Sequence, residues 1–344
     1  MINNKSYEID LDGTIQNVKK YKIQAKSGDS IVIRYHGELN GKSGAYPYVR
    51  EKTIDEFYIL REETRYFPIF RLPDSIEYIN NLLNPKSEDE FELSIKLLRE
   101  GNVCSNLLRT GDTYIGSNPT IAVGYFETKT FNFGQVHYSL SKEVFIQELE
   151  KLIKDVEKFM SRYLVAKIDR LRIILIPDNY GSFVINDTLF LEEKALTQAF
   201  FLIHELIHTK WNPKVEMNCQ RTRFFDEALT QYFTFRMLEA TDIQSAEIAK
   251  GEFLTGFEEM KRELEEVPPL AKWGEMGVSD LAYNFGPLIF IELEKKLGRK
   301  DMDILLARLL NEFKYREVDF EKFIEIIPKE NGKDYFRHIL YRLK

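Results

Sequence analysis

Hydrophobic and polar residues alternate along the first 130 residues of the chain, most clearly at residues 31–35 and 91–95. A period of two is typical of strands that bury one face in a sheet. Turn-forming residues separate these runs, and residues 121–126 are expected to form a closing strand. Residues 76–83 fit a helix or a strand equally well. This half of the chain is predicted to form a β-sandwich or a curled sheet.

The hydrophobic period lengthens after Ser141, where apolar residues recur every three or four positions from Phe145 to Phe159. Ser141 is a suitable N-cap, so an amphipathic helix is expected to run to about Tyr163. A continuous apolar run at residues 171–176 predicts a buried strand, and residues 183–191 are a second strand candidate.

The pattern beyond Glu193 is helical to the end of the chain, with breaks expected near Pro213, at Pro268-Pro269 and at Gly298. Strands followed by helices, rather than strands alternating with helices, predict an α+β fold. We expect a β-sandwich-like N-terminal domain over residues 1–130 and a mostly helical domain over residues 131–344.

The composition limits the classes of partner. The chain has 344 residues, of which 44% are hydrophobic and 30% charged, and its formal net charge is −7. This length favours two domains, or one with a large extension. The excess of negative charge disfavours nucleic acid or an anionic membrane as the main partner.

The start of the chain lacks a basic segment followed by an apolar run, so no secretory signal is expected. The apolar stretch before His204 is too short to span a bilayer, so membrane insertion is not expected. Cys104 and Cys219 allow at most one disulfide and form no metal-binding cysteine motif. A reducing cytoplasm is the predicted location.

The residues from His204 to His208 form the pattern H-E-x-x-H within a helical segment. A spacing of four residues places both imidazoles on one face of a helix, where they can bind one ion, with Glu205 beside them. Zinc prefers imidazole and carboxylate ligands, and a catalytic zinc keeps one position for water. The plain alternative is a buried helix that happens to carry two histidines. Burying two imidazoles and a carboxylate among apolar neighbours is costly unless something binds them, which favours the metal site.

A third ligand is required, and Glu227 is the best candidate, because it belongs to a second apolar, helical segment. A carboxylate that points inward there would complete a site of two histidines and one glutamate, with one zinc ion per chain. Glu227 could instead be a solvated charge at a helix start. Asp226 and Glu216 are alternative ligands.

These residues resemble the gluzincin metallopeptidases of the aminopeptidase N and leukotriene hydrolase type. In that family a zinc-binding glutamate, in the context N-E-[GA], follows H-E-x-x-H after eighteen residues. Here eighteen residues lie between His208 and Glu227, in the context Asp226-Glu227-Ala228. The resemblance implies that Glu227 binds zinc and that a thermolysin-like catalytic domain follows the N-terminal β-domain. The chain has no room for the large C-terminal helical domain of the longest members, so it resembles a short form.

A second match to the family lies downstream, where the family has Y-x-K-G before an apolar helix. This chain has Tyr283-Asn-Phe-Gly286, with Phe285 in place of the lysine. The resemblance implies that Tyr283 donates a hydrogen bond to the oxyanion of the tetrahedral intermediate. Without the family, a core tyrosine would be the more natural interpretation. Tyr232 is the next candidate for this role.

The family also carries G-x-M-E-N on an edge strand, and its glutamate grips the α-amino group of the substrate. Glu127 lies in a similar sequence but about eighty residues before His204, too far for this role. The better positional match places Val184 where the glutamate would be, with Asp178 as a nearby acidic substitute. An ammonium group without a carboxylate partner binds poorly, so cleavage that tolerates a blocked N-terminus is expected, as endopeptidase or relaxed activity, unless Asp178 or Glu127 folds into the missing place.

The predicted function is therefore zinc-dependent hydrolysis of peptides. Glu205 is expected to act as the general base, while the zinc and Tyr283 stabilise the oxyanion. The alternative from another class is a non-enzymatic peptide-binding or scaffold protein that keeps the fold, although a purely structural metal site needs no general base. A third interpretation is epoxide hydrolysis, which the leukotriene branch of the family performs. The sequence contains no specific sign of it.

Overall fold

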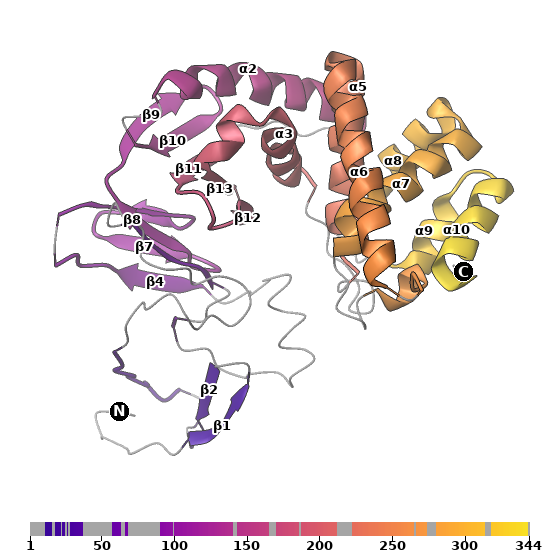
Figure 1. Ribbon diagram of the computed structural model, residues 1–344. Coiled ribbons are helices and arrows are strands. Elements are labelled where there is room, and N and C mark those ends of the chain that lie inside the picture. Colours follow the sequence, from indigo (N-terminus) through magenta and orange to yellow (C-terminus); the bar gives the residue numbers. More distant parts are fainter. Residues whose placement is uncertain are drawn as a thin grey trace. The chain divides into compact units, whose positions relative to one another are not determined.

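The computed structural model describes residues 11–15, 18–21, 23–24, 26, 28–36, 57–62, 66–67, 90–98, 100–139, 143–164, 170–185, 187–211, 222–264, 266–273, 280–313 and 318–342 (Figure 1). Its contacts divide the chain into two compact units. Unit 1 comprises Met1–Glu127 and Ile176–Gly181, and unit 2 comprises Thr128–Leu175 and Ser182–Lys344.

The described part of unit 1 is built from short antiparallel strands. Its three sheets are β1-β2, β3-β8-β5 and β4-β7-β6. The strands are β1 (Leu11–Ile15), β2 (Val18–Tyr21), β3 (Tyr58–Leu60), β4 (Phe91–Ser94), β5 (Asn102–Ser105), β6 (Leu108–Thr110), β7 (Thr113–Gly116) and β8 (Ile121–Gly124). The Tyr114 hydroxyl of β7 donates to the Val103 carbonyl of β5 at 3.4 Å, which joins the two three-stranded sheets. The predicted strands at residues 91–95 and 121–126 are confirmed as β4 and β8.

The strand predicted at residues 31–35 is wrong beyond its first residue, because only Ile31 forms a bridge. The side chains of Val32, Ile33 and Tyr35 are exposed. Alternation of apolar and polar residues makes a strand possible, but a strand also needs a neighbour to complete its backbone hydrogen bonds. The ambiguous segment at residues 76–83 lies outside the described residues.

Unit 2 begins with a five-stranded sheet in the order β12-β13-β11-β10-β9. The strands are β9 (Glu127–Phe131), β10 (Gly134–Tyr138), β11 (Leu171–Ile176), β12 (Phe183–Ile185) and β13 (Thr188–Glu192). Helix α2 (Glu143–Met160) connects β10 to β11, which run parallel. A Cβ atom on Gly134 would lie 1.8 Å from the Leu171 carbonyl oxygen, so only glycine allows this close pairing. The helix and the buried strand predicted here are confirmed.

The single strand predicted at residues 183–191 is wrong, because the chain folds into the antiparallel hairpin β12-β13. Ile185 pairs with Thr188, and the residues between them in the sequence, Asn186 and Asp187, are types that favour turns. Among the described strands, the hairpin makes β12 an edge strand of the sheet.

The rest of unit 2 is helical, as predicted, and the α+β class is confirmed. Breaks occur between α6 and η5, where Pro268-Pro269 lies, and at Gly298 between α7 and α8, while Pro213 lies outside the described residues. The helical segments are η3 (Glu193–Thr197), α3 (Ala199–His208), η4 (Phe224–Ala228), α5 (Leu229–Thr241), α6 (Ile243–Glu263), η5 (Leu270–Lys272), α7 (Asp280–Leu297), α8 (Arg299–Glu312), α9 (Phe320–Ile326) and α10 (Glu330–Arg342).

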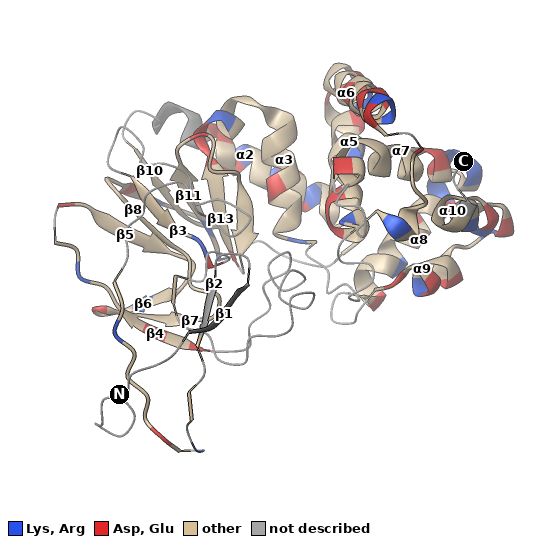
Figure 2. Ribbon diagram, turned by 60° about the horizontal axis from the view of Figure 1, so that its bottom comes forward, with Lys and Arg blue, Asp and Glu red and all other residues tan. Residues whose placement is uncertain are grey.

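Helix α5 is the centre of this helical part, since α3, α6 and α7 all pack against it. Blue and red segments are interspersed along α6, α8 and α10 in Figure 2, so these helices carry mixed charge rather than a basic stripe. None of the described helices is both long enough and apolar enough to cross a membrane.

Candidate metal centre

Helix α3 presents His204 and His208 on one side. Its apolar residues Leu202, Ile203, Leu206 and Ile207 are buried in the core, which fixes the rotation of the helix about its axis. The two Nε2 atoms lie 3.1 Å apart, and the ring centroids are 4.6 Å apart. The pair predicted from the four-residue spacing is therefore assembled by the helix itself.

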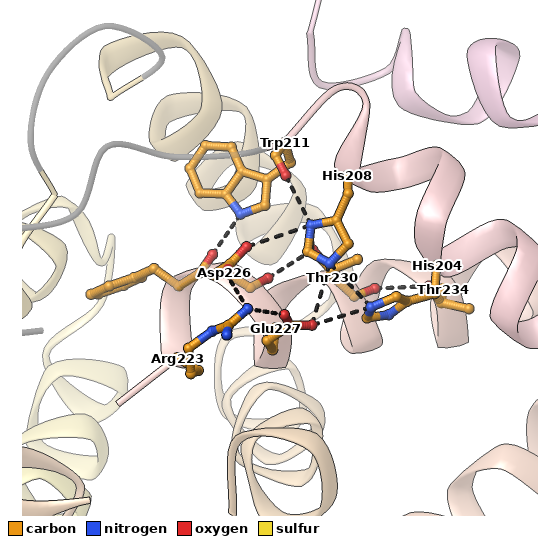
Figure 3. Close-up of polar contacts among 9 residues, drawn as sticks. His204, His208, Trp211, Arg223, Asp226, Glu227, Thr230 and Thr234 are labelled. Atoms are coloured by element: carbon orange, nitrogen blue, oxygen red, sulfur yellow. Dashed lines mark hydrogen bonds and ion pairs between the residues drawn. The ribbon is translucent and has the colours of Figure 1, made fainter. Parts of the chain in front are cut away.

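The carboxylate of Glu227 completes a three-residue cluster with these histidines. Its Oε2 atom lies 3.2 Å from Nε2 of His204 and 3.3 Å from Nε2 of His208. Figure 3 shows both rings and this carboxylate turned toward one another. Within the described part of the chain, these three residues form the group of side chains that could hold a metal ion.

The spacing of the three atoms fits a zinc ion. A tetrahedral ion with bonds of about 2.0 Å requires ligand atoms about 3.3 Å apart. The three observed separations, from 3.1 to 3.3 Å, are close to that value. Two imidazole nitrogens and one carboxylate oxygen are also the ligands of many catalytic zinc sites, in which a fourth position takes water. The residues present therefore fit zinc in both chemistry and spacing.

Glu227 lies in η4, a π-helical segment that precedes α5. The Arg223 carbonyl accepts hydrogen bonds from the Glu227 amide at 2.9 Å and from the Ala228 amide at 3.3 Å. Arg223 has a φ of 52°, in the left-handed region that few residues other than glycine adopt. The ring of Phe224 stacks on Phe290 of α7, with centroids 4.7 Å apart, which anchors η4 in the core. Such π-helical turns recur at functional sites, where they shift a side chain around the helix.

Asp226 points to a different side of His208 from Glu227. Its Oδ1 atom lies 3.5 Å from Nδ1 of His208, whereas the three-residue cluster is formed by Nε2. The Trp211 carbonyl lies 3.4 Å from the same Nδ1 atom, and the Thr230 hydroxyl lies 3.5 Å from it. The described geometry therefore favours Glu227 over Asp226 as the third ligand. Glu216, the other alternative, lies outside the described residues.

The buried charges of the site shift the pKa values of its members. Burial lowers the pKa of His208, but the carboxylates of Glu227, Asp226 and Glu205 outweigh burial and raise it to about 9. Burial raises the pKa of Glu227, but Arg223 and His208 outweigh it and hold the pKa well below its usual range. Glu227 is therefore a carboxylate, the form that binds a metal.

The two predicted catalytic residues belong to elements that border the cluster. Glu205 follows His204 on α3, is half-buried, and is close enough to His208 to raise its pKa. Tyr283 lies in α7, which packs against η4. Burial, the Glu227 carboxylate and a hydrogen bond to it raise the pKa of the Tyr283 hydroxyl well above its usual value. The structure thus brings Glu205 and Tyr283 together with the three candidate ligands.

Gly286 explains how Tyr283 comes so close. A Cβ atom on Gly286 would lie 2.2 Å from Cβ of Ala228, the residue after Glu227. Helix α7 can approach η4 only because this position lacks a side chain. The motif that contains Tyr283 and Gly286 therefore has a packing role in this chain, beside the chemical role that the resemblance implies.

Tyr232, the alternative to Tyr283, has its hydroxyl outside the group of candidate ligands. It is fully buried, and its hydroxyl donates a hydrogen bond to Glu294 of α7. The Tyr283 hydroxyl is instead hydrogen-bonded to Glu227, one of the three candidate ligands. The alternative based on Tyr232 is therefore set aside.

The three residues considered for the amine anchor lie on different elements. Val184 is in the edge strand β12, pairs with Leu189, and is partly buried against the core of unit 2. Glu127 begins β9, and Asp178 precedes Gly181 in the segment that belongs to unit 1. Val184, the position predicted to match the family's glutamate, therefore packs against the core as an apolar side chain.

Sequence reasoning missed Arg223 and the part that Asp226 plays. One nitrogen of Arg223, Nη2, donates to Oδ2 of Asp226 at 2.9 Å and to Oε1 of Glu227. The spacing of four residues between Arg223 and Glu227 is a signal for an ion pair on a helix. It could have pointed to this contact, but neither the left-handed backbone nor the π-helical turn is visible in the sequence.

Known structures with the same fold are zinc peptidases and related hydrolases. Yeast leukotriene A4 hydrolase in complex with bestatin aligns with 100% of this chain, at a TM-score of 0.66 and 15% identity. An M1 zinc metallopeptidase from Deinococcus radiodurans aligns with 71% of the chain, at a TM-score of 0.54 and 14% identity. The native hydrolase from Saccharomyces cerevisiae gives a TM-score of 0.57 and 17% identity over 71% of the chain.

These similarities establish the fold, which is that of M1 zinc metallopeptidases and leukotriene A4 hydrolase. The chain spans 60% of the yeast hydrolase with bestatin, 61% of the Deinococcus enzyme and 45% of the native yeast hydrolase. The sequence matches no protein-family profile.

Proposed function

We propose that this protein is a zinc-dependent metallopeptidase of the aminopeptidase N-like, gluzincin type. The observation that carries the proposal is the triangle of ligand atoms from His204, His208 and Glu227, with sides of 3.1 to 3.3 Å. The fold shared with M1 zinc metallopeptidases supports it. The proposed ligands are these three residues, and they hold one zinc ion per chain.

The chemistry that zinc supplies when bound is Lewis acidity, which lowers the pKa of water and polarises a carbonyl group. Glu205 takes the proton from the attacking water and passes it to the leaving amine. Tyr283 donates a hydrogen bond to the oxyanion that develops on the scissile carbonyl. A peptidase without Glu205 has no base beside the attacking water, so this residue separates an enzyme from a binding protein.

The substrate is an extended peptide held by the edge strand β12. Among the described strands, β12 lies at the edge of the five-stranded sheet, where an extended peptide can add as a further strand. Main-chain pairing places no demand on the sequence of the substrate. The Deinococcus enzyme has been seen with a Tyr-Ser-Ala substrate, which supports a peptide as the ligand class.

The mode of cleavage follows from Val184. An apolar side chain cannot pair with the ammonium group of a peptide, and a desolvated ammonium without a partner costs several kcal/mol. The enzyme is therefore proposed to tolerate a blocked N-terminus, as an endopeptidase does. N-terminal acetylation of a good substrate tests this mode: cleavage that persists supports it, and cleavage that disappears shows that an amine anchor exists.

The proposed function is tested by incubating the purified wild type and Glu205→Gln with a mixed peptide library, after the zinc content of both has been measured. The wild type is expected to hold about one zinc and to cleave peptides. Glu205→Gln should hold the same zinc and lose about a hundredfold to ten-thousandfold in rate, because an amide cannot accept the proton. A wild type that binds zinc but cleaves nothing would favour the non-enzymatic, peptide-binding alternative.

A further inference from the structure

The two carboxylate oxygens of Glu227 have different partners. Oε2 faces the Nε2 atoms of His204 and His208, whereas Oε1 accepts a hydrogen bond from Arg223 (Figure 3). An oxygen that accepts a hydrogen bond from a guanidinium group is a weaker metal ligand, because part of its negative charge is already neutralised. The contact therefore favours metal binding through Oε2, the oxygen that faces the histidines.

The same nitrogen of Arg223 also holds Asp226. Nη2 lies 2.9 Å from Oδ2 of Asp226, and the other oxygen of Asp226 lies 3.5 Å from Nδ1 of His208. Carboxylates on the far nitrogen of a histidine ligand fix its tautomer and orientation in many metal sites. Arg223 thus touches one candidate ligand directly and reaches a second one through Asp226.

The backbone of Arg223 is committed to the same segment. A left-handed conformation is strained for a residue with a Cβ atom, and glycine would remove the strain. The Arg223 carbonyl accepts the hydrogen bonds of the first π-helical turn. Its side chain donates to the carboxylates of residues 226 and 227 in the same turn. Backbone and side chain both act on the segment that carries Glu227.

We propose that Arg223 is a positioning residue of the metal centre, which holds Glu227 in a one-oxygen mode and, through Asp226, sets the orientation of His208. The inference rests on the proposed zinc site. It concerns two residues that sequence reasoning did not place in this role. Coulomb repulsion between a guanidinium group and a nearby zinc ion weakens metal binding. If Arg223 acted only through its charge, its removal would therefore tighten zinc binding. If Arg223 positions the ligands, its removal weakens zinc binding.

The test is the zinc affinity of Arg223→Gln, measured by competition with a chelator, without any assay of hydrolysis. Glutamine keeps some length and polarity but cannot hold both carboxylates as a cation does. Loss of an outer partner of this kind typically weakens metal binding about tenfold to a hundredfold. Cobalt-loaded protein gives a second readout, because its visible absorption is expected to change when Glu227 can offer both oxygens.

Arg337→Gln is the matched control. Arg337 lies on α10, and one of its nitrogens contacts Glu330 at 2.8 Å and Asp334 at 3.2 Å. It therefore makes the same kind of double contact as Arg223, but with two exposed carboxylates of its own helix. This variant is expected to keep the zinc affinity and the cobalt spectrum of the wild type.

Asp226→Ala tests the contact from Arg223 through Asp226 to His208. It replaces Arg223→Gln in the experiment if that variant does not fold. It should weaken zinc binding less than Arg223→Gln, and the double variant should lose less than the two single losses combined, because both act through one bridge. Unchanged or tighter zinc binding in Arg223→Gln would overturn the inference while leaving the zinc site in place. A wild type that binds no zinc would overturn both.

Discussion

Two buried polar clusters lie along the same helical part of unit 2, and their contacts differ in kind. The metal cluster consists of His204, His208 and Glu227 with the partners Arg223 and Asp226. The second cluster, here the Arg236 cluster, is centred on Arg236 of α5 and consists of Tyr163, Tyr232, Arg236, Glu294 and Asp303. Arg236 is 1% exposed and Glu227 is 6% exposed, so burial alone does not distinguish the two clusters.

Contacts in the Arg236 cluster are spread among separate pairs. Arg236 lies 2.8 Å from Asp303 of α8 through Nη2 and 3.7 Å from Glu294 of α7 through Nε. The rings of Tyr163 and Tyr232 lie 5.9 and 5.8 Å from its guanidinium carbon, and each hydroxyl donates to one of the two carboxylates. This arrangement ties α5 to α7, α8 and the end of α2, which is a packing role.

Contacts in the metal cluster instead converge on one point. Three ligand atoms from two elements approach one another within 3.3 Å, while Nδ1 of His208 and Oε1 of Glu227 face Asp226 and Arg223. Pairs of opposite charges join the elements that carry them, whereas convergent lone pairs are the arrangement that binds a cation. The two clusters are similarly buried, but polar atoms converge on one point in the metal cluster and form separate pairs in the Arg236 cluster. The direction of the polar atoms, rather than their burial, therefore distinguishes a cluster that can bind an ion from a structural one.

The largest expected effect comes from His204→Ala. Two remaining ligands make a poor site, so the zinc content should fall from about one ion per chain to nearly none. Elemental analysis of the purified protein measures it. His338→Ala, which changes an exposed histidine on α10, should keep its zinc. Full zinc content in His204→Ala would mean that the metal cluster lies elsewhere.

Tyr283→Phe should reduce the rate of hydrolysis about a hundredfold to a thousandfold, since it removes one donor to the oxyanion. Zinc content and substrate affinity should stay near their wild-type values, because the ring remains. Steady-state kinetics on one good peptide separates the effects on kcat and KM. Cleavage at the wild-type rate would show that another donor serves the oxyanion.

Arg236→Met should lower the free energy of unfolding by about 3 kcal/mol, because it leaves buried carboxylate contacts half-made. The cost lies at the low end for such pairs, since the Asp303 side chain is 45% exposed and can be solvated. Denaturant unfolding measures it. Added zinc should still raise Tm as it does in the wild type, because a ligand that binds only the folded state stabilises it. If added zinc no longer raised the Tm of Arg236→Met, zinc binding would depend on the Arg236 cluster.

Tyr232→Phe is expected to have the smallest effect, a loss of about 1 kcal/mol in the free energy of unfolding with no change in the rate of hydrolysis. The variant removes the hydroxyl that donates to Glu294 and serves as the matched control for Tyr283→Phe. Thermal unfolding and the same peptide assay measure both quantities. A large loss of rate would place Tyr232 in the catalytic machinery, against its position in the core.

The sequence by itself determined the features that depend on local spacing. The four-residue interval between His204 and His208 needs only one helix, so the pair could be predicted without tertiary structure. The period of the apolar residues likewise predicted β4, α2, β11 and the helical second half. The prediction failed at residues 32–35, where the alternating pattern forms no strand, and at residues 183–191, where the pattern missed the turn between β12 and β13.

Tertiary structure decided how the two neighbouring acidic residues face the histidines, although the spacing shared with the family already favoured Glu227 as the ligand. Glu227 and Asp226 are neighbours in the sequence, and a helical pattern gives no reason to prefer one of them. The left-handed backbone at Arg223 and the π-helical turn after it rotate Glu227 toward Nε2 of both histidines and Asp226 toward Nδ1 of His208. The close contact between Gly286 and Ala228 brings Tyr283 to the same place. These positions depend on packing between segments far apart in the sequence, which no local pattern encodes.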